Sequence, residues 1–192
     1  MDDAVNLSKT ELEKMLAGEL YDGNDPLLIS MRLKARKLFT RYNQTDYADV
    51  RQRYEILQQL LGTIGTRIDI QAPFYCDYGC YIHAGENVFM NFNCIILDCN
   101  YVYLGDNVFF GPNVQVYTAY HPLNAHERIK GPEYAAPIRI GNNVWIGGSA
   151  IVCQGVTIGD NTTIGAGSVV VRNIPANVFA AGNPCRVIRE LK

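Results

Sequence analysis

Histidine is scarce in this 192-residue chain: the three are His83, His121 and His126. His121 precedes Pro122, which favours an extended backbone at the histidine. Because the unperturbed pKa of imidazole lies near working pH, His121 could act as a general base that takes a proton from a hydroxyl group. From position alone, a surface-loop histidine without a catalytic role is the simpler interpretation.

Three further polar residues upstream could complete such a site. Asn91 lies about thirty residues before His121, and its amide could donate to a developing oxyanion. Asp77 and Asp98 could bind hydroxyl groups of a substrate. All three residue types are also typical of turns, so residue type alone leaves both interpretations open.

The strongest pattern in the chain is a six-residue repeat that would position these side chains. Each repeat begins with an aliphatic residue, usually followed by Gly, and has a small or β-branched residue at its fifth position. Six consecutive repeats begin at Ile140, Ile146, Val152, Ile158, Ile164 and Val170, and earlier ones begin at Ile82, Val88, Leu104, Phe110 and Val116. Three repeats predict one triangular coil with the aliphatic residues inside, and stacked coils predict a parallel β solenoid.

The repeat leaves two other parts of the chain to explain. Residues 1–62 predict amphipathic helices packed on the solenoid of residues 63–192. The helix start signals are a capping box at Ser8 or Thr10, the pair Asp25-Pro26, and Thr45-Asp46, with Gly62 as the last stop. Within the solenoid, the register breaks between residues 118 and 137, which predicts an extruded loop that carries His121.

Composition and charge exclude several classes of function. The net charge is −2 and no run of Lys and Arg stands out, so we expect no nucleic-acid partner. No stretch is long and apolar enough for a membrane span, and the polar start MDDAVNLSKTELEK lacks a secretory signal. We therefore expect a cytoplasmic protein, whose six cysteines, without a Cys-x-x-Cys pair, are mostly small buried hydrophobes.

Several motifs together resemble the hexapeptide-repeat acetyltransferases, in the maltose and galactoside O-acetyltransferase branch. They are the hexads, Tyr117-Thr-Ala-Tyr-His-Pro, Ile140-Gly-Asn-Asn-Val-Trp-Ile-Gly-Gly, Ala181-Gly-Asn-Pro-Cys-Arg-Val-Ile-Arg, Lys14-Met-Leu-Ala-Gly-Glu-Leu-Tyr and Arg41-Tyr-Asn. The resemblance implies a mainly β, left-handed parallel β-helix. It implies acetyl transfer from acetyl-CoA, as co-substrate, to a sugar hydroxyl without a metal. It also implies a homotrimer with active sites between chains.

The resemblance also implies roles for individual residues on the acceptor side. His121 matches the catalytic base, and Asn91 matches an acceptor-site asparagine that helps stabilise the transition state. Further acceptor-binding positions fall on Asp77, Asp98, Glu133 and either Asp22 or Gly23. Glu133 could instead orient His121. Cys99 departs from the pattern, because that position is often acidic in the family.

For coenzyme A, the resemblance implies the flank of the C-terminal coils. The matching residues are Trp145, Gly148, Ala166, Val171, Arg172, Arg186 and Arg189. Small residues allow close approach of a narrow ligand, and guanidinium groups suit phosphates. Trp145 is equally well explained as a residue of a subunit contact.

Two alternative functions share the predicted fold. A sister family of β-helix trimers, also similar in outline, hydrates carbon dioxide with a metal bound by three histidines. In this chain the ligands would be His83, His121 and His126, and three imidazoles with an open water position are a sensible zinc site. The other alternative is a non-catalytic solenoid scaffold that uses its flat faces to bind partners.

Overall fold

The computed structural model describes residues 9–192, and its first helix lies where the sequence predicts it. α1 (Glu11–Ala17) begins after Thr10 and ends at Gly18, whose φ is 74°. Thr10 and Glu13 form a capping box, because each side chain bonds to the backbone N–H of the other residue. The alternative box at Ser8 begins outside the described residues.

α2 (Pro26–Gln44) also begins as predicted. The Asp25 carboxylate accepts from the N–H groups of Leu27 and Leu28, and Pro26 occupies the first helical position, where no N–H is needed. The residues on the predicted apolar face are buried or partly buried: Leu28, Met31, Ala35, Leu38 and Tyr42. This face therefore packs on the rest of the chain, as its spacing indicates.

The start of α3 (Val50–Leu60) was predicted wrongly, at Thr45-Asp46. The Asp46 carboxylate instead accepts a backbone N–H within a short turn. Asp49 is the residue that caps the helix. Two aspartates lie close together before this helix, and the sequence pattern does not distinguish the turn residue from the cap.

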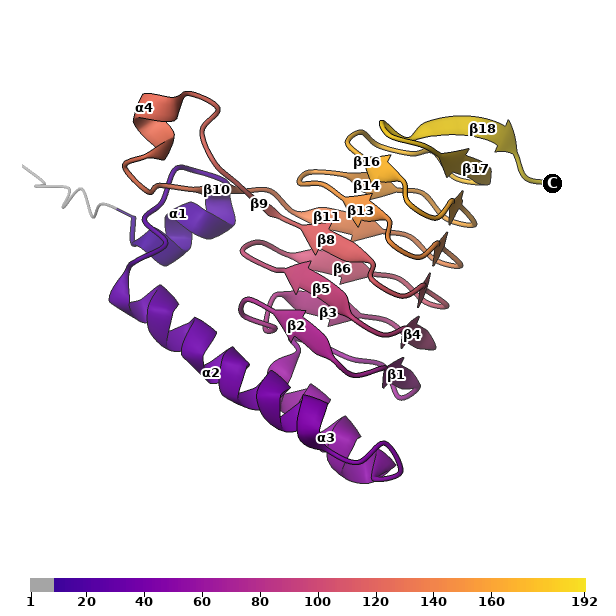
Figure 1. The fold of residues 1–192 in the computed structure, drawn as a ribbon, viewed down its shortest axis with the longest axis horizontal. Coiled ribbons are helices and arrows are strands. Elements are labelled where there is room, and N and C mark those ends of the chain that lie inside the picture. The colour runs from indigo at the N-terminus through magenta and orange to yellow at the C-terminus, as the bar shows by residue number, and fades with distance from the viewer. Residues whose placement is uncertain (1–8) are drawn as a thin grey trace, which may run out of the picture.

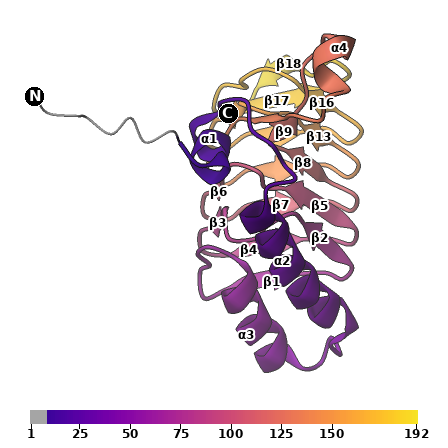
Figure 2. The same cartoon turned by 90° about the vertical axis from the view of Figure 1, so that its left-hand side faces the viewer.

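Three sheets, parallel except for the last strand of the first sheet, form the walls of a prism (Figures 1 and 2). In spatial order, the first sheet contains β1 (Ile68–Ile70), β4 (Val88–Met90), β7 (Phe109–Phe110), β12 (Trp145–Ile146), β15 (Thr163–Ile164), β17 (Val178–Ala181) and β18 (Arg186–Glu190). The second contains β16 (Val169–Val170), β13 (Ile151–Val152), β8 (Gln115–Tyr117), β5 (Cys94–Leu97) and β2 (Phe74–Cys76). The third contains β14 (Thr157–Ile158), β11 (Ile138–Ile140), β6 (Val102–Leu104) and β3 (Ile82–Ala84).

The hexads define the interior of this prism. The first residues of the six consecutive hexads are all buried: Ile140, Ile146, Val152, Ile158, Ile164 and Val170. Equivalent residues pair between coils, as in Ile140 with Leu104 on one side and Ile158 on the other. The structure thus confirms the predicted left-handed parallel β-helix and the inward direction of its aliphatic residues.

A ladder of asparagines runs along one corner of the prism. Asn87, Asn107, Asn143, Asn161 and Asn177 all have φ between 56° and 60°. The side-chain amide of each of the first four donates to the next asparagine along the ladder, over 2.8 to 2.9 Å. The left-handed backbone at this corner is therefore carried by asparagine, which tolerates that conformation better than most residues.

The glycines at this corner have a different role from the asparagines. Gly141 does not have a positive φ. A Cβ at Gly141 would lie 2.2 Å from Asp160 Oδ1 and 2.8 Å from the Asp160 backbone nitrogen. Glycine is therefore needed here because successive coils approach closely.

The helical segment shares its core with the solenoid. Buried residues of α2 and α3 belong to the same apolar cluster as the interior of the coils, among them Tyr42, Ile56 and Leu60. A smaller cluster joins Met15, Tyr21 and Leu28 to Tyr78 and Ala135. We propose that residues 1–62 and 63–192 fold as one unit with this common core.

The loop leaves the solenoid between β8 and β11 and contains a short hairpin. β9 (Ala119–Tyr120) and β10 (Tyr134–Ala135) pair antiparallel, and α4 (Ala125–Arg128) lies at the tip (Figure 1). The C-terminal segment forms β18 and pairs antiparallel with β17. The hexads stop before this strand, so their period does not predict it.

Candidate active site

His121 lies where β9 ends, in an exposed groove on the hairpin. The other residues that line this groove are Tyr120, Pro122, Leu123, Glu127, Tyr134 and Gln154. His121 Nδ1 is 3.2 Å from the carbonyl oxygen of Pro132. A carbonyl oxygen can only accept, so Nδ1 carries a hydrogen, and in the neutral imidazole the lone pair then lies on Nε2. The hairpin therefore holds the imidazole in the tautomer that a general base needs.

Glu133 faces the N-terminal segment from the other strand of the hairpin. Its carboxylate accepts from the hydroxyl of Tyr21 at 2.8 Å. The two backbones also exchange two hydrogen bonds of 3.0 Å each. Tyr21 is only 1% exposed, so the partner that fixes Glu133 is itself fixed in the core.

The structure distinguishes between Asp22 and Gly23. A Cβ at Gly23 would lie 3.2 Å from Glu133 Oε1, so Gly23 borders the carboxylate. The Asp22 side chain instead accepts from the backbone N–H of Asn24 in a local turn and is exposed. Gly23, rather than Asp22, therefore lies beside the predicted acceptor residues.

Asp77 and Cys99 lie in the same neighbourhood. The Cys99 thiol donates to Asp77 Oδ2 at 3.4 Å. Burial raises the pKa of Cys99, which keeps the thiol protonated and able to donate. Burial also raises the pKa of Asp77, with Cys99 opposing the shift. Asp77 thus presents a partly desolvated carboxylate with one oxygen bound to the thiol.

Asp98 lies beneath this surface and not on it. It is 0% exposed, and its carboxyl oxygens accept from the backbone N–H groups of Asp77, Tyr78 and Tyr81 at 3.0, 2.9 and 3.4 Å. A side chain so enclosed does not offer an oxygen to a ligand. In this arrangement Asp98 holds the backbone that carries Asp77, which differs from the predicted direct contact with the acceptor.

Asn91 lies on a different corner of the prism from His121. It follows β4, where the chain passes from the first sheet to the second, and its side-chain oxygen accepts from the N–H of Phe92 at 2.7 Å. His121 follows β9, after the chain has left the second sheet. Because the two corners lie on opposite sides of the second sheet, one chain does not bring the two residues together.

The predicted coenzyme A residues divide between the same two corners. Gly148 and Ala166 lie in successive turns between the first and second sheets, on the corner of Asn91. Val171 and Arg172 follow the second sheet, on the corner of His121. Trp145 is 56% exposed on β12, and Arg186 and Arg189 lie on β18.

The three histidines do not form a metal site. His83 lies on β3, where its ring stacks on Tyr103 at 5.2 Å and its Nδ1 is 3.1 Å from the Thr63 hydroxyl. His126 lies on α4, exposed at the tip of the loop. Within residues 9–192, no three His, Cys, Asp or Glu side chains gather as metal ligands would, so the ligand set of the zinc alternative is not assembled.

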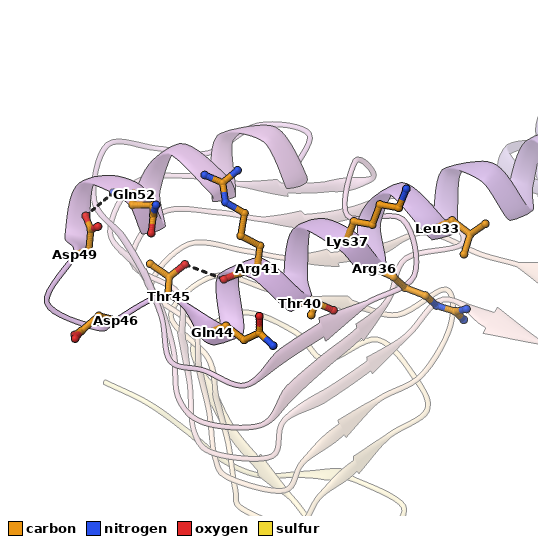
Figure 3. Close-up of a pocket in the computed structure, with 10 residues that line it drawn as sticks. All are labelled: Leu33, Arg36, Lys37, Thr40, Arg41, Gln44, Thr45, Asp46, Asp49 and Gln52. Carbon is orange, nitrogen blue, oxygen red and sulfur yellow. Dashed lines mark hydrogen bonds between the residues drawn. The ribbon is translucent and has the colours of Figure 1, made fainter.

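A second groove lies apart from this site. A groove beside the C-terminal half of α2 is lined by residues from Leu33 to Gln52, none of them a predicted site residue (Figure 3).

Among the described residues, no helix is both long and apolar enough to cross a membrane.

Sequence reasoning missed Tyr21 and Pro132. Both contacts join segments far apart in the chain, as Tyr21 and Glu133 are 112 positions apart. Tyr21 ends the motif Lys14-Met-Leu-Ala-Gly-Glu-Leu-Tyr, but the motif does not show which residue the tyrosine contacts, and Pro132 belongs to no motif. Only the pairing of the hairpin with the N-terminal segment identifies them.

Comparison with known proteins confirms the predicted resemblance. The maltose acetyltransferase hexapeptide capping motif matches residues 14–65, and the bacterial transferase hexapeptide (six repeats) matches residues 137–172. Galactoside O-acetyltransferase of Escherichia coli K12 is 42% identical, over 97% of this chain and 91% of that protein.

Solved structures agree with these matches. A maltose O-acetyltransferase from Clostridium difficile 630 has a TM-score of 0.95 and 50% identity, over 96% of this chain and 98% of that one. A galactoside acetyltransferase in complex with coenzyme A has a TM-score of 0.94 and 41% identity, over 96% and 92%. The chain therefore belongs to the hexapeptide-repeat acetyltransferases, in the branch of the maltose and galactoside O-acetyltransferases.

Proposed function

We propose that this protein transfers an acetyl group from acetyl-CoA directly to a sugar hydroxyl, with His121 as general base. Nε2 of His121 takes the hydroxyl proton while the acceptor oxygen attacks the thioester carbonyl carbon. The carbon–sulfur bond then breaks, and the coenzyme A thiolate receives the proton from the imidazolium. The observation that carries this proposal is the contact of His121 Nδ1 with the Pro132 carbonyl, which in the neutral imidazole favours the tautomer with the lone pair on Nε2.

The acceptor side of the site suits a molecule with several hydroxyl groups. Glu133 and Asp77 each have one carboxylate oxygen bound within the protein, to Tyr21 and to Cys99. Their other oxygens can accept from acceptor hydroxyls. Asp98 contributes by holding the Asp77 backbone, and Asp22 by shaping the turn beside Gly23. The relatives named for maltose and galactosides support a sugar as the acceptor.

We further propose that the complete site lies between two chains of a homotrimer. His121 with Val171 and Arg172 would come from one chain, and Asn91 with Gly148 and Ala166 from its neighbour. This arrangement accounts for the division of the predicted residues between two corners. Asn91 would then donate to the oxyanion, while Trp145, Arg186 and Arg189 would contact coenzyme A.

We also propose a cytoplasmic location. Acetyl transfer by this route needs a supply of acetyl-CoA at the enzyme. All six cysteines are free thiols, and four of them are buried, which fits a reducing compartment.

The first test is release of free thiol from acetyl-CoA with a panel of mono- and disaccharides and thiogalactosides, with and without a metal chelator. We expect chelator-insensitive release with at least one sugar. His121→Ala should lower kcat by about two to four orders of magnitude while acetyl-CoA binding persists, because only the base is lost.

Either of two outcomes would contradict the proposal. Unchanged turnover in His121→Ala would remove this residue from the mechanism. Absence of release with every acceptor, together with stoichiometric bound zinc, would favour the metal-dependent sister family instead.

A further inference from the structure

We propose that Tyr21 is a positioning residue for His121, acting through Glu133 and Pro132. This inference rests on the proposed role of His121 as general base. It assigns to the N-terminal segment a part in setting the tautomer of a histidine that lies about one hundred residues later in the chain.

Tyr21 pairs with Glu133 in an antiparallel bridge, so the N-terminal segment lies beside the end of the hairpin. Glu133 follows Pro132 and precedes β10, and its backbone N–H and C=O both bond to Tyr21. On the other side of β10, Tyr134 pairs with Tyr120, the residue before His121. The end of β10 is thus fixed between β9 and the N-terminal segment.

The phenol of Tyr21 adds a side-chain bond to this main-chain contact. Its hydroxyl donates to Glu133 Oε2, and Gly23 leaves room for the other carboxylate oxygen. Tyr21 packs in the smaller core cluster with Met15 and Leu28. A hydrogen bond to a charged acceptor is stronger than one between neutral groups, so this bond stabilises the position of Glu133.

The rest of the loop offers little packing that could hold Pro132. Leu123 is 96% exposed and Ile129 is 78% exposed, and the bonds of α4 and its flanks are local to residues 122–131. The Pro132 carbonyl is therefore held through the next two residues, Glu133, whose backbone bonds to Tyr21, and Tyr134, which pairs with Tyr120. We refer to Tyr21, Glu133 and Pro132 as the hairpin clamp.

The clamp determines which nitrogen of His121 is protonated. While the Pro132 carbonyl stays 3.2 Å from Nδ1, the Nδ1–H tautomer is favoured. If the carbonyl moves away, the Nε2–H tautomer gains population, and that form has no lone pair at the nitrogen that must take the proton. Loss of the clamp should lower kcat more than it changes the KM for acetyl-CoA.

The direct experiment is nitrogen-15 NMR of the imidazoles in the whole protein, which needs no acceptor. His121 is assigned by comparison with His121→Ala. We expect the wild type to show Nδ1–H at His121, and Tyr21→Phe and Glu133→Ala to show a mixture of tautomers. Glu133→Gln should keep Nδ1–H, because its amide oxygen still accepts from the Tyr21 hydroxyl.

Kinetics give the second readout. Tyr21→Phe should lower kcat about tenfold with little change in the KM for acetyl-CoA, and Tyr21→Phe/Glu133→Ala should be no worse than Glu133→Ala. Tyr42→Phe is the matched control, because Tyr42 is also 1% exposed and donates to a backbone carbonyl, at Ile70, away from the hairpin. Tyr42→Phe should lower stability but leave kcat and the tautomer unchanged.

The two proposals can fail separately. Wild-type tautomer and kcat in both Tyr21→Phe and Glu133→Ala would overturn the clamp and leave the role of His121 intact. Full activity in His121→Ala would overturn the general base, while the NMR experiment would still decide whether Tyr21 sets the tautomer.

Discussion

At the scale of single residues, Asp98 is a fully buried acid with a strongly raised pKa. Burial raises its pKa to about 8, and the N–H groups of Tyr78 and Tyr81 oppose the shift. The folded state therefore keeps a proton on Asp98 at pH values where the unfolded chain, with an ordinary pKa of 3.8, has released it. Its contribution to the free energy of unfolding is full below about pH 4 and declines as the pH rises to about 8.

The direction of this pKa shift predicts how Asp98→Asn changes the pH dependence of stability. The free energy of unfolding of the wild type should fall more steeply between about pH 5 and pH 8 than that of the variant, because asparagine does not titrate. Urea denaturation across this range measures both slopes. Parallel slopes would mean that Asp98 is ionised in the folded protein and held by its three N–H donors.

The sequence indicated single residues better than their contacts. Residue type and the neighbouring Pro122 made His121 a candidate base, because pKa and backbone restriction are local properties, but only the family motif around it favoured that role over a surface histidine. The tautomer could not be identified from the sequence, since it depends on the carbonyl of Pro132 across the hairpin. The burial of Asp98 was also hidden, because aspartate next to a turn is more often exposed.

At the scale of elements, the asparagine ladder is the device that repeats from coil to coil. Asn143 lies in its middle, donating to Asn161 and accepting from Asn107. Its φ of 57° is one that a residue with a Cβ adopts at a cost unless its side chain bonds locally. Asparagine therefore stabilises this corner in two ways, because its side chain forms the hydrogen bonds of the ladder and its backbone tolerates the left-handed conformation.

Substitutions at Asn143 separate these two sources. Asn143→Gly should cost about 1 to 3 kcal/mol, because two hydrogen bonds are lost but the backbone is unstrained. Asn143→Ala should cost about 1 kcal/mol more, for the left-handed backbone. Urea denaturation of both variants checks the order, and equal costs would show that backbone strain is unimportant at this corner.

The elements were predictable where a period repeats and less so elsewhere. Hexads specify the strands from Ile82 onward because each aliphatic residue must point inward. The start of α3 depends on the cap at Asp49. The formation of β18 depends on its antiparallel pairing with β17. Neither feature repeats along the chain, so the hexad period does not predict it.

At the scale of the whole molecule, the five strands of the second sheet separate the two halves of the predicted site. The corner with Asn91 and the corner with His121 lie on either side of this sheet. A site built from both corners needs two chains, which fits the cyclic assembly proposed above.

Complementation between variants tests this arrangement. His121→Ala and Asn91→Ala should each be impaired alone, but mixed trimers should regain activity, since one of the three sites in each mixed trimer then combines an intact His121 with an intact Asn91. Co-expression with two purification tags provides the mixed trimers, and light scattering gives their mass. Mixed trimers no more active than either parent would place both residues in the same chain's site.

The exit of the hairpin from the solenoid has a consequence for how this enzyme could diversify. β8 below the loop and β11 above it keep the ordinary coil register with their neighbours, Val116 with Val152 and Leu104 with Ile140. The stack therefore continues unchanged whatever length of chain is inserted between them. Mutation could remodel the loop beside the acceptor while the coils proposed to hold the acetyl donor stay the same, so new acceptors could evolve without a new enzyme being built.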